Sequence, residues 1–212
     1  MIQVMLVDDH ELVRAGLRRI IEDSPDIRVS AEASSGEQAL RLGRERPPDI
    51  FLLDVSLPGL SAFEITRKLV RAHGDAEVII LAGHAKAPFP TRLLDAGARG
   101  YLTRDCEPAE LLEAIRTVRS GTLYIGSEAA KQLALSMLPG TAESPFDGLS
   151  AREMEVMLKL TEGTRVPDIA SMMCLSPKTI ATYKYRIYDK LGTRNEVDLV
   201  RMCMRYGLVE AS

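Results

Sequence analysis

The sequence of 212 residues contains no apolar run long enough to cross a membrane, since a spanning helix needs about 20 predominantly apolar residues. Residues 1–7 lack the basic segment that opens a secretion signal. Cysteine is scarce, and Cys106, Cys174 and Cys203 form no CxxC pair, so they predict neither a disulfide framework nor a zinc site. We therefore expect a protein of the reducing cytoplasm, with no membrane partner.

The sequence also has no repeats and no low-complexity segments. Its composition, with 46% hydrophobic and 27% charged residues, excludes a disordered or collagen-like chain. The length predicts two small domains better than one large domain. The net charge of −3 is unevenly spread, because residues 165–195 carry six basic and two acidic side chains. That local excess would attract nucleic acid. A solvated helix face would give the same excess, so charge alone decides nothing.

The first 120 residues alternate short apolar runs with amphipathic stretches. Such runs are typical of strands buried on both faces, and stripes with a period near 3.6 predict helices. Five successive strand–helix units predict an α/β fold with a doubly wound parallel sheet. The expected strands are residues 4–7, 29–33, 50–53, 78–81 and 101–102, and the expected helices are residues 12–21, one opened at 35–37, 63–70, 90–96 and 108–118.

Carboxylates follow two of the expected strands: Asp8 and Asp9 come after the first, and Asp54 ends the third. Ligands of doubly wound sheets bind beyond the carboxyl ends of the strands. A carboxylate cluster repels itself unless a cation neutralises it, and oxygen ligands, here including the main-chain carbonyl of Ser56, suit Mg²⁺. Asp54 is then a candidate nucleophile toward a phosphoryl group. Alternatively, Asp8 and Asp9 cap the first helix and Asp54 starts a turn.

Three segments resemble the receiver domain of bacterial response regulators: VDDH at residues 7–10, LDVSLPG at 53–59 and AGARGYL at 96–102. The resemblance covers residues 1–120 and implies a flavodoxin-like (βα)5 fold with strand order 2-1-3-4-5. It further implies that Asp54 accepts a phosphoryl group from a sensor histidine kinase, and that Asp8 and Asp9 hold Mg²⁺.

Two positions depart from the receiver pattern. Where receivers usually have a Ser or Thr that bonds the phosphoryl group, this chain has Ala82, and where they have a Lys it has Arg104. Arginine keeps the charge but not the shape of lysine. Tyr101 is the aromatic that swings inward in receivers, or else a half-buried side chain against the fourth helix. Ser56 and His84 stand where receivers tune hydrolysis of the phosphoryl group, although His84 could equally be a solvated loop residue.

After residue 121 the alternation stops. Residues 127–137 predict a linker helix capped by Ser127, and two prolines, two glycines and a serine within 139–148 predict a loop. We therefore divide the chain into a receiver domain at 1–121, a linker helix and loop at 122–148, and an all-α domain at 149–212.

The third part has four expected helices. Ser150 and Glu153 form a capping box for the first, and Pro167 opens a short second helix. Ser176 and Pro177 start a third helix, which ends at residue 191, and the fourth covers residues 196–205. A short helix, a turn and a longer helix make a helix-turn-helix, whose second helix reads bases in the major groove.

The expected helix at 177–191 has an apolar stripe, formed by Ile180, Tyr183, Ile187 and Leu191. The opposite face has small and hydroxylated side chains flanked by cations, which suits DNA. A helical bundle with a basic face that serves solubility is the alternative. The candidate DNA-binding residues are Lys178, Thr179, Ala181, Thr182, Lys184, Tyr185, Arg186 and Lys190.

Residues 149–209 also resemble the LuxR-type DNA-binding domain. The matching residues are Leu149-Ser150-x-Arg152-Glu153, Ile169-Ala170, LSPKTI at 175–180, Tyr183, Arg186-Ile187 and Lys190-Leu191. A receiver joined to this module is typical of the NarL/FixJ class of response regulators. The segments PFPTRLL at 88–94 and TYKYRI at 182–187 resemble GacA/UvrY-type members most. The resemblance implies a transcription factor with a hybrid sensor kinase as its partner and promoters of small regulatory RNAs as its targets. We also expect a homodimer on double-stranded DNA, with the helix at 196–205 at its interface through Val197, Val200 and Met204.

Three functional hypotheses follow. The first is a transcription factor controlled by phosphorylation of Asp54. The second keeps DNA binding but treats the receiver as a degenerate switch, because of Ala82 and Arg104. The third is an Mg²⁺-dependent phosphohydrolase, which the missing lysine and hydroxyl disfavour, so we expect no enzyme.

Overall fold

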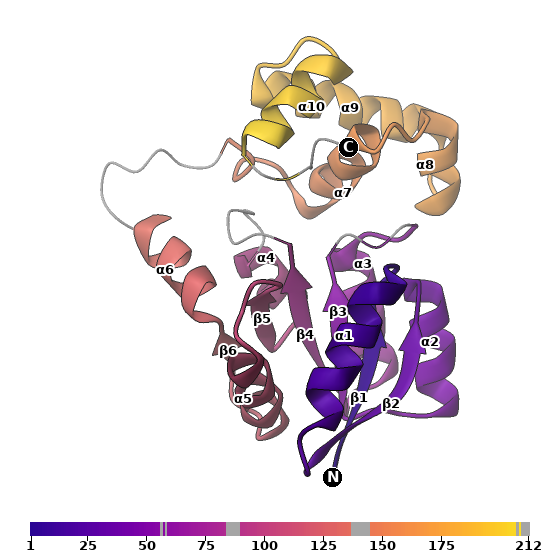
Figure 1. The fold of residues 1–212 in the computed structure, drawn as a ribbon. Helices are drawn as coiled ribbons and strands as arrows, with labels where there is room; N and C mark the ends of the chain where they lie inside the picture. Colours follow the sequence, from indigo (N-terminus) through magenta and orange to yellow (C-terminus); the bar gives the residue numbers. More distant parts are fainter. Residues whose placement is uncertain (56, 58, 84–89, 137–144, 207, 209–212) are drawn as a thin grey trace. The chain divides into compact units, whose positions relative to one another are not determined.

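The computed structural model describes the chain except for residues 56, 58, 84–89, 137–144, 207 and 209–212. The described residues divide into two compact units, one that runs through Ala134 and one that follows it (Figure 1). No described helix is both long enough and apolar enough to span a membrane.

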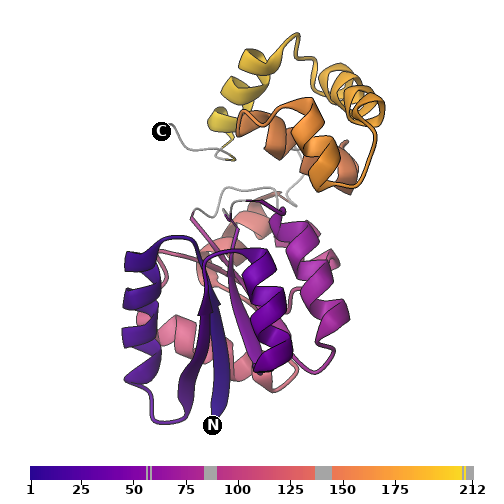
Figure 2. The same cartoon turned by 90° about the vertical axis from the view of Figure 1, so that its right-hand side faces the viewer.

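The first unit is built on a parallel sheet of six strands in the order β2-β1-β3-β4-β5-β6. Helices cover both faces of the sheet (Figures 1 and 2). This confirms the expected fold class and the 2-1-3-4-5 order of the first five strands. The strands are β1 Ile2–Val7, β2 Ile27–Ala33, β3 Ile50–Asp54, β4 Glu77–Ala82, β5 Gly100–Thr103 and β6 Tyr124–Ile125. The helices are α1 Glu11–Glu22, α2 Gly36–Glu45, α3 Ala62–Ala72, α4 Pro90–Asp95, α5 Pro108–Arg119 and α6 Ser127–Ser136.

The sixth strand was not expected from the sequence. β6 extends the sheet beside β5, and Gly126 N donates to Tyr101 O at 2.8 Å. Helix α6 begins at Ser127, as expected, but Gly126 O accepts from Ala130 N at 2.8 Å, so Gly126 rather than Ser127 occupies the capping position. The boundaries at residues 121 and 148 remain predictions.

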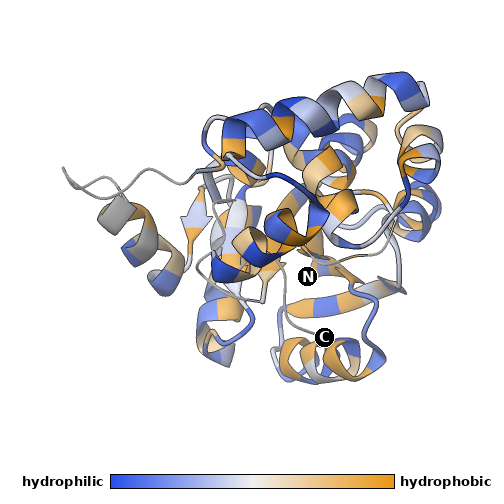
Figure 3. Ribbon diagram, turned by 90° about the horizontal axis from the view of Figure 1, so that it is seen from above, coloured by the Kyte–Doolittle hydropathy of each residue, from blue (hydrophilic) through white to orange (hydrophobic). Residues whose placement is uncertain are grey.

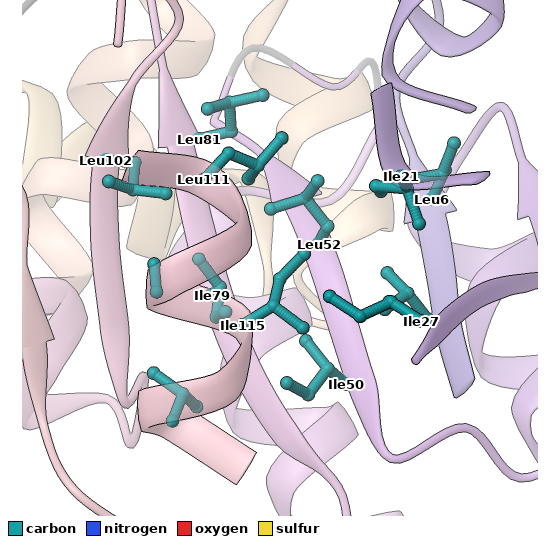
Figure 4. Packing of buried hydrophobic residues seen from close by; sticks show 13 residues of the cluster. Leu6, Ile21, Ile27, Ile50, Leu52, Ile79, Leu81, Leu102, Leu111 and Ile115 are labelled. Atoms are coloured by element: carbon teal, nitrogen blue, oxygen red, sulfur yellow. The ribbon is translucent and has the colours of Figure 1, made fainter. Parts of the chain in front are cut away.

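The strands are apolar on both faces because helices bury both. In β1, Val4 and Leu6 belong to a buried cluster with residues of α1 and α5. Met5 and Val7 are buried as well, but they lie outside that cluster. Figure 4 shows leucines and isoleucines of β1, β3, β4, β5, α1 and α5 packed together. Burial of apolar surface stabilises by roughly 25 cal/mol per Å². The packed sheet therefore holds the carboxyl ends of β1 and β3 side by side.

The second unit contains the helices α7 Ala151–Thr161, α8 Val166–Met172, α9 Pro177–Leu191 and α10 Glu196–Arg205. The capping box of Ser150 and Glu153 is present, and Ser176 Oγ accepts from Thr179 N at 3.1 Å at the start of α9. Gly192 ends α9 in the left-handed region at φ +65°, which glycine adopts without steric cost.

Hydrophobic residues recur among hydrophilic ones along these helices (Figure 3). In α9 the side chains of Ile180, Ile187 and Leu191 are buried, which confirms the expected packing stripe, and Tyr183 is half-buried.

Candidate phosphoacceptor pocket and DNA-binding surface

Asp8 and Asp54 lie at the same edge of the sheet. Strands β1 and β3 pair in parallel with Val7 opposite Leu53, so the next residue of each strand continues to the shared edge. Both side chains are almost completely buried, at 2% and 1% exposure. Buried carboxylates are costly unless they are paired, so this pair requires a compensating cation.

Arg104 supplies that cation. Its Nη2 atom lies 3.0 Å from Asp8 Oδ2 and 2.7 Å from Asp54 Oδ1, so one guanidinium bridges both carboxylates. The residue follows β5, and its main-chain N donates to Ala82 O at 2.8 Å, which fixes it beside the end of β4. Arg104 stands where receivers usually have a lysine, and its side chain reaches both acids.

Asp9 is exposed and forms a second grouping with Asp8 and His10. His10 Nδ1 lies 2.8 Å from Asp9 Oδ1 and 3.3 Å from Asp8 Oδ1. One ligand atom from each of the three residues lies within 4.8 Å of the others, so the grouping can hold a cation. Carboxylate oxygens fit Mg²⁺, whereas an imidazole suits transition metals better.

The alternative role of these acids as helix caps is wrong, because His10 occupies the N-cap position of α1. Sequence reasoning missed His10 as a neighbour of both acids. It also missed Arg14, whose Nη1 donates to the main-chain oxygen of Asp8 at 2.6 Å. The spacing of four residues from His10 to Arg14 places both on one side of the helix start, which was the available signal.

The switch positions lie at the ends of β4 and β5. Ala82 is 3% exposed and stands opposite Thr103 in the parallel register. Tyr101 is fully buried rather than half-buried, and its hydroxyl has no hydrogen-bond partner in the described part of the chain. Burial raises the pKa of the Tyr101 phenol above its usual range. Ser56 and His84, which were expected to contribute to this pocket, lie outside the described residues.

The outer face of α9 presents several of the expected DNA-binding side chains. Tyr185 is 74% exposed, and Lys178, Thr182 and Arg186 are exposed as well. Ala181 is half-buried at the edge of this face. These residues therefore remain available to a partner.

The other three candidates contact their own unit. Thr179 is half-buried, and its Oγ1 lies 2.8 Å from Ser176 Oγ. Lys184 Nζ lies 2.5 Å from Glu196 Oε1, and Lys190 Nζ lies 2.6 Å from Glu153 Oε2. Sequence reasoning missed both glutamates as partners of α9, because they are 12 and 37 residues away and no local spacing signals such pairs.

Residues 4–116 match the model of the response regulator receiver domain, and residues 147–203 match that of the bacterial regulatory proteins of the luxR family. The chain belongs to the LuxR-type response regulators. It is 46% identical to Response regulator UvrY of Escherichia coli (strain K12) over 212 residues, which cover 100% of this chain and 97% of UvrY. It is also 46% identical to Response regulator GacA of Pseudomonas viridiflava over 213 residues, which cover 100% of both.

RcsB from Salmonella enterica serovar Typhimurium, in its structure bound to promoter rprA with the phosphomimetic BeF3−, superposes with a TM-score of 0.80. The superposition covers 96% of this chain and 99% of the RcsB chain, with 21% sequence identity, so this likeness shows the fold alone. The family expected from the sequence is confirmed. LuxR-type response regulators are DNA-binding transcription regulators, and receiver domains generally bind Mg²⁺ at their acidic phosphorylation site.

Proposed function

We propose that this LuxR-type response regulator controls transcription through phosphorylation of Asp54 by a sensor histidine kinase. The observation that carries the proposal is the bridge by which Arg104 joins Asp54 to Asp8 at the edge where Asp9 also lies. An Asp54 carboxylate oxygen attacks phosphorus, a P–O bond forms, and the bond from phosphorus to the nitrogen of the kinase histidine breaks.

Asp8, Asp9 and Asp54 would hold Mg²⁺ in this pocket, together with the main-chain carbonyl of Ser56. When bound, the ion would neutralise negative charge on these acids and on the phosphoryl group. Arg104 then has a second anion to pair with, because a guanidinium binds phosphoryl oxygens as well as carboxylates. Arg104, which compensates the charge of Asp54, would thus also bind the phosphoryl group on Asp54.

The DNA-binding proposal rests on α9. Its exposed Thr182 and Tyr185 would contact base edges in the major groove, and Lys178 and Arg186 would contact phosphates. We expect a homodimer on an operator with two-fold half-sites. The edge of α10 supports this, since Val197 is 58% exposed and Met204 is 40% exposed.

The proposal also places the protein in the cytoplasm, with DNA and a hybrid sensor kinase as partners, no membrane partner and no enzymatic turnover. Promoters of small regulatory RNAs remain the expected targets.

A DNA titration with and without acetyl phosphate and Mg²⁺ tests the proposal, with Asp54→Asn as the control. The native protein should bind a labelled duplex more tightly after phosphodonor treatment, and the variant should not respond. An intact-mass gain without an affinity gain would instead support the degenerate switch, in which DNA binding is independent of phosphorylation. Sustained turnover of a phosphoester would support the phosphohydrolase.

A further inference from the structure

Two ion pairs attach α9 to neighbouring helices, and they differ in burial. Lys190 pairs with Glu153 of α7, whose side chain is 4% exposed. Lys184 pairs with Glu196 at the first position of α10, and here the two side chains are 28% and 52% exposed. The same helix therefore has one lysine tied to a buried acid and one tied to an acid that faces solvent.

The buried pair is structural. Glu153 Oε2 also accepts from Ser150 N at 2.7 Å, as part of the capping box of α7. Withdrawing Lys190 would leave a buried carboxylate without its cation, which is strongly destabilising. Contact between Lys190 and a DNA phosphate would therefore cost folding stability, because Lys190 would have to leave Glu153.

The exposed pair is exchangeable. Ion pairs between exposed side chains contribute little net stability, so another anion in the same position can replace Glu196 as the partner of Lys184. The Lys184 ammonium also lies 5.7 Å from the centre of the Tyr188 ring. The hydrogen bond that Lys184 donates to Glu196 raises the pKa of Lys184, so the lysine is charged in this pair.

Glu196 lies next to the surface proposed to bind DNA. Lys184 precedes Tyr185 by one residue, about 100° around the helix, and it therefore borders the exposed face. A carboxylate held 2.5 Å from the lysine Nζ places a negative charge at that border, where phosphates would approach.

We propose that Glu196 lowers the DNA affinity of α9 by competing with phosphate for Lys184. The proposal rests on the proposed role of α9 in DNA binding. In the native protein the Lys184 charge is already compensated, and Glu196 repels the phosphate backbone. The two cations of α9 that have no acidic partner among the described residues, Lys178 and Arg186, then provide the phosphate contacts. Non-specific binding, which is almost entirely electrostatic, is reduced most.

The test uses the full-length protein and a fluorescein-labelled duplex of random sequence, titrated at several salt concentrations. Glu196→Gln should bind this duplex several-fold more tightly, and the slope of log K against log salt should steepen by about one, since one further phosphate contact forms. Adding Lys184→Ala to Glu196→Gln should cancel both changes. In the native background, Lys184→Ala should reduce the slope less than Lys178→Ala does.

Asp198→Asn is the matched control, because Asp198 is another acid of the first turn of α10 and its removal changes the net charge equally. A steeper slope for Asp198→Asn equal to that of Glu196→Gln would overturn the proposal, since the effect would then be general charge. An unchanged slope for Glu196→Gln, with an unchanged melting temperature, would also overturn it while leaving the DNA-binding role of α9 intact. If Lys178→Ala and Arg186→Ala leave the native slope unchanged too, the proposed role of α9 fails with it.

Discussion

Arg104 Nη2 lies 2.7 Å from Asp54 Oδ1, so the expected phosphoacceptor is already paired with a cation of its own chain. The same nitrogen reaches Asp8, and both acids are buried. An arginine in this position therefore compensates the two buried acids, and under the proposed function it would also accommodate Mg²⁺ and the phosphoryl group.

Replacing Arg104 with Gln should make the stability of the first unit dependent on Mg²⁺. Without the metal, we expect the free energy of unfolding to fall by about 3 kcal/mol, because a buried acid loses its cation. Saturating Mg²⁺ should restore most of the loss, since the ion replaces the guanidinium charge. Urea denaturation with and without Mg²⁺ measures both effects.

Arg119→Gln is the control for this experiment. Arg119 Nε lies 3.0 Å from Asp49 Oδ1, in a pair that is more exposed and distant from the carboxyl ends of the strands. Its loss should cost no more than about 1 kcal/mol and should not depend on Mg²⁺. Equal stability of Arg104→Gln with and without Mg²⁺ would contradict the account of the pocket.

Restoring both residues of the usual receiver pattern should strengthen the response to phosphorylation. In the double variant Ala82→Thr, Arg104→Lys, a hydroxyl and an ammonium become available to the phosphoryl group. Each bond to a charged group contributes roughly 1.5–3 kcal/mol. The ratio of DNA affinities with and without phosphodonor should therefore rise by about tenfold or more. A native ratio already equal to that of the double variant would show that Ala82 and Arg104 do not weaken the switch.

The exposed side chains of α9 should divide into base-reading and phosphate-binding groups. Tyr185→Ala and Thr182→Val should change which bases are preferred, at a cost of roughly 1–3 kcal/mol on the best site. Lys178→Ala should weaken binding to all sequences similarly. Selection from a randomised duplex pool, followed by titration of the selected and scrambled duplexes, distinguishes the groups. Equal losses on both duplexes for Tyr185→Ala would show that it only positions the helix.

The stability of the first unit should fall as the pH drops below about 6.5, the ordinary pKa of histidine. His73 ends α3 and packs against the Phe51 ring at 5.4 Å between centroids. Burial lowers the pKa of His73, and the nearby charge of Arg44 lowers it further. The unfolded chain therefore binds a proton before the folded one does, so this contribution is complete above the unfolded pKa and is lost as the pH falls toward the folded pKa.

Urea denaturation at a series of pH values checks this prediction against His73→Gln, which cannot titrate. The variant should show a flatter dependence of unfolding free energy on pH between about 7 and 5. Parallel curves for the two proteins would assign the acid sensitivity to other groups.

Much of the fold was predictable because burial on both faces leaves a strong local signal. The run at residues 50–53 predicts a strand, and β3 is buried along its whole length. The start of α7 was predictable too, because the capping box of Ser150 and Glu153 is a pattern within four consecutive residues. Strand β6 was missed because two residues have no periodicity, and only pairing with β5 makes them a strand.

In the candidate site, too, only the features that leave a signal in the local sequence could be predicted. Asp8 and Asp54 could be placed together because parallel strands end at a common edge. The contact of Arg104 Nη2 with both acids could not be predicted, since it depends on how far the Arg104 side chain extends in three dimensions. The partners of Lys184 and Lys190 were likewise hidden, because each lies on another helix.

The central claim, that Asp54 is the phosphoacceptor, is tested most directly by locating the modification after incubation with acetyl phosphate and Mg²⁺. Borohydride reduction converts an aspartyl phosphate to homoserine, and the tryptic peptide of residues 45–67 contains both Asp49 and Asp54. The account predicts homoserine at residue 54 in the native protein and none anywhere in Asp54→Asn. Homoserine at Asp49, Asp8 or Asp9, or an equal yield in Asp54→Asn, would contradict it.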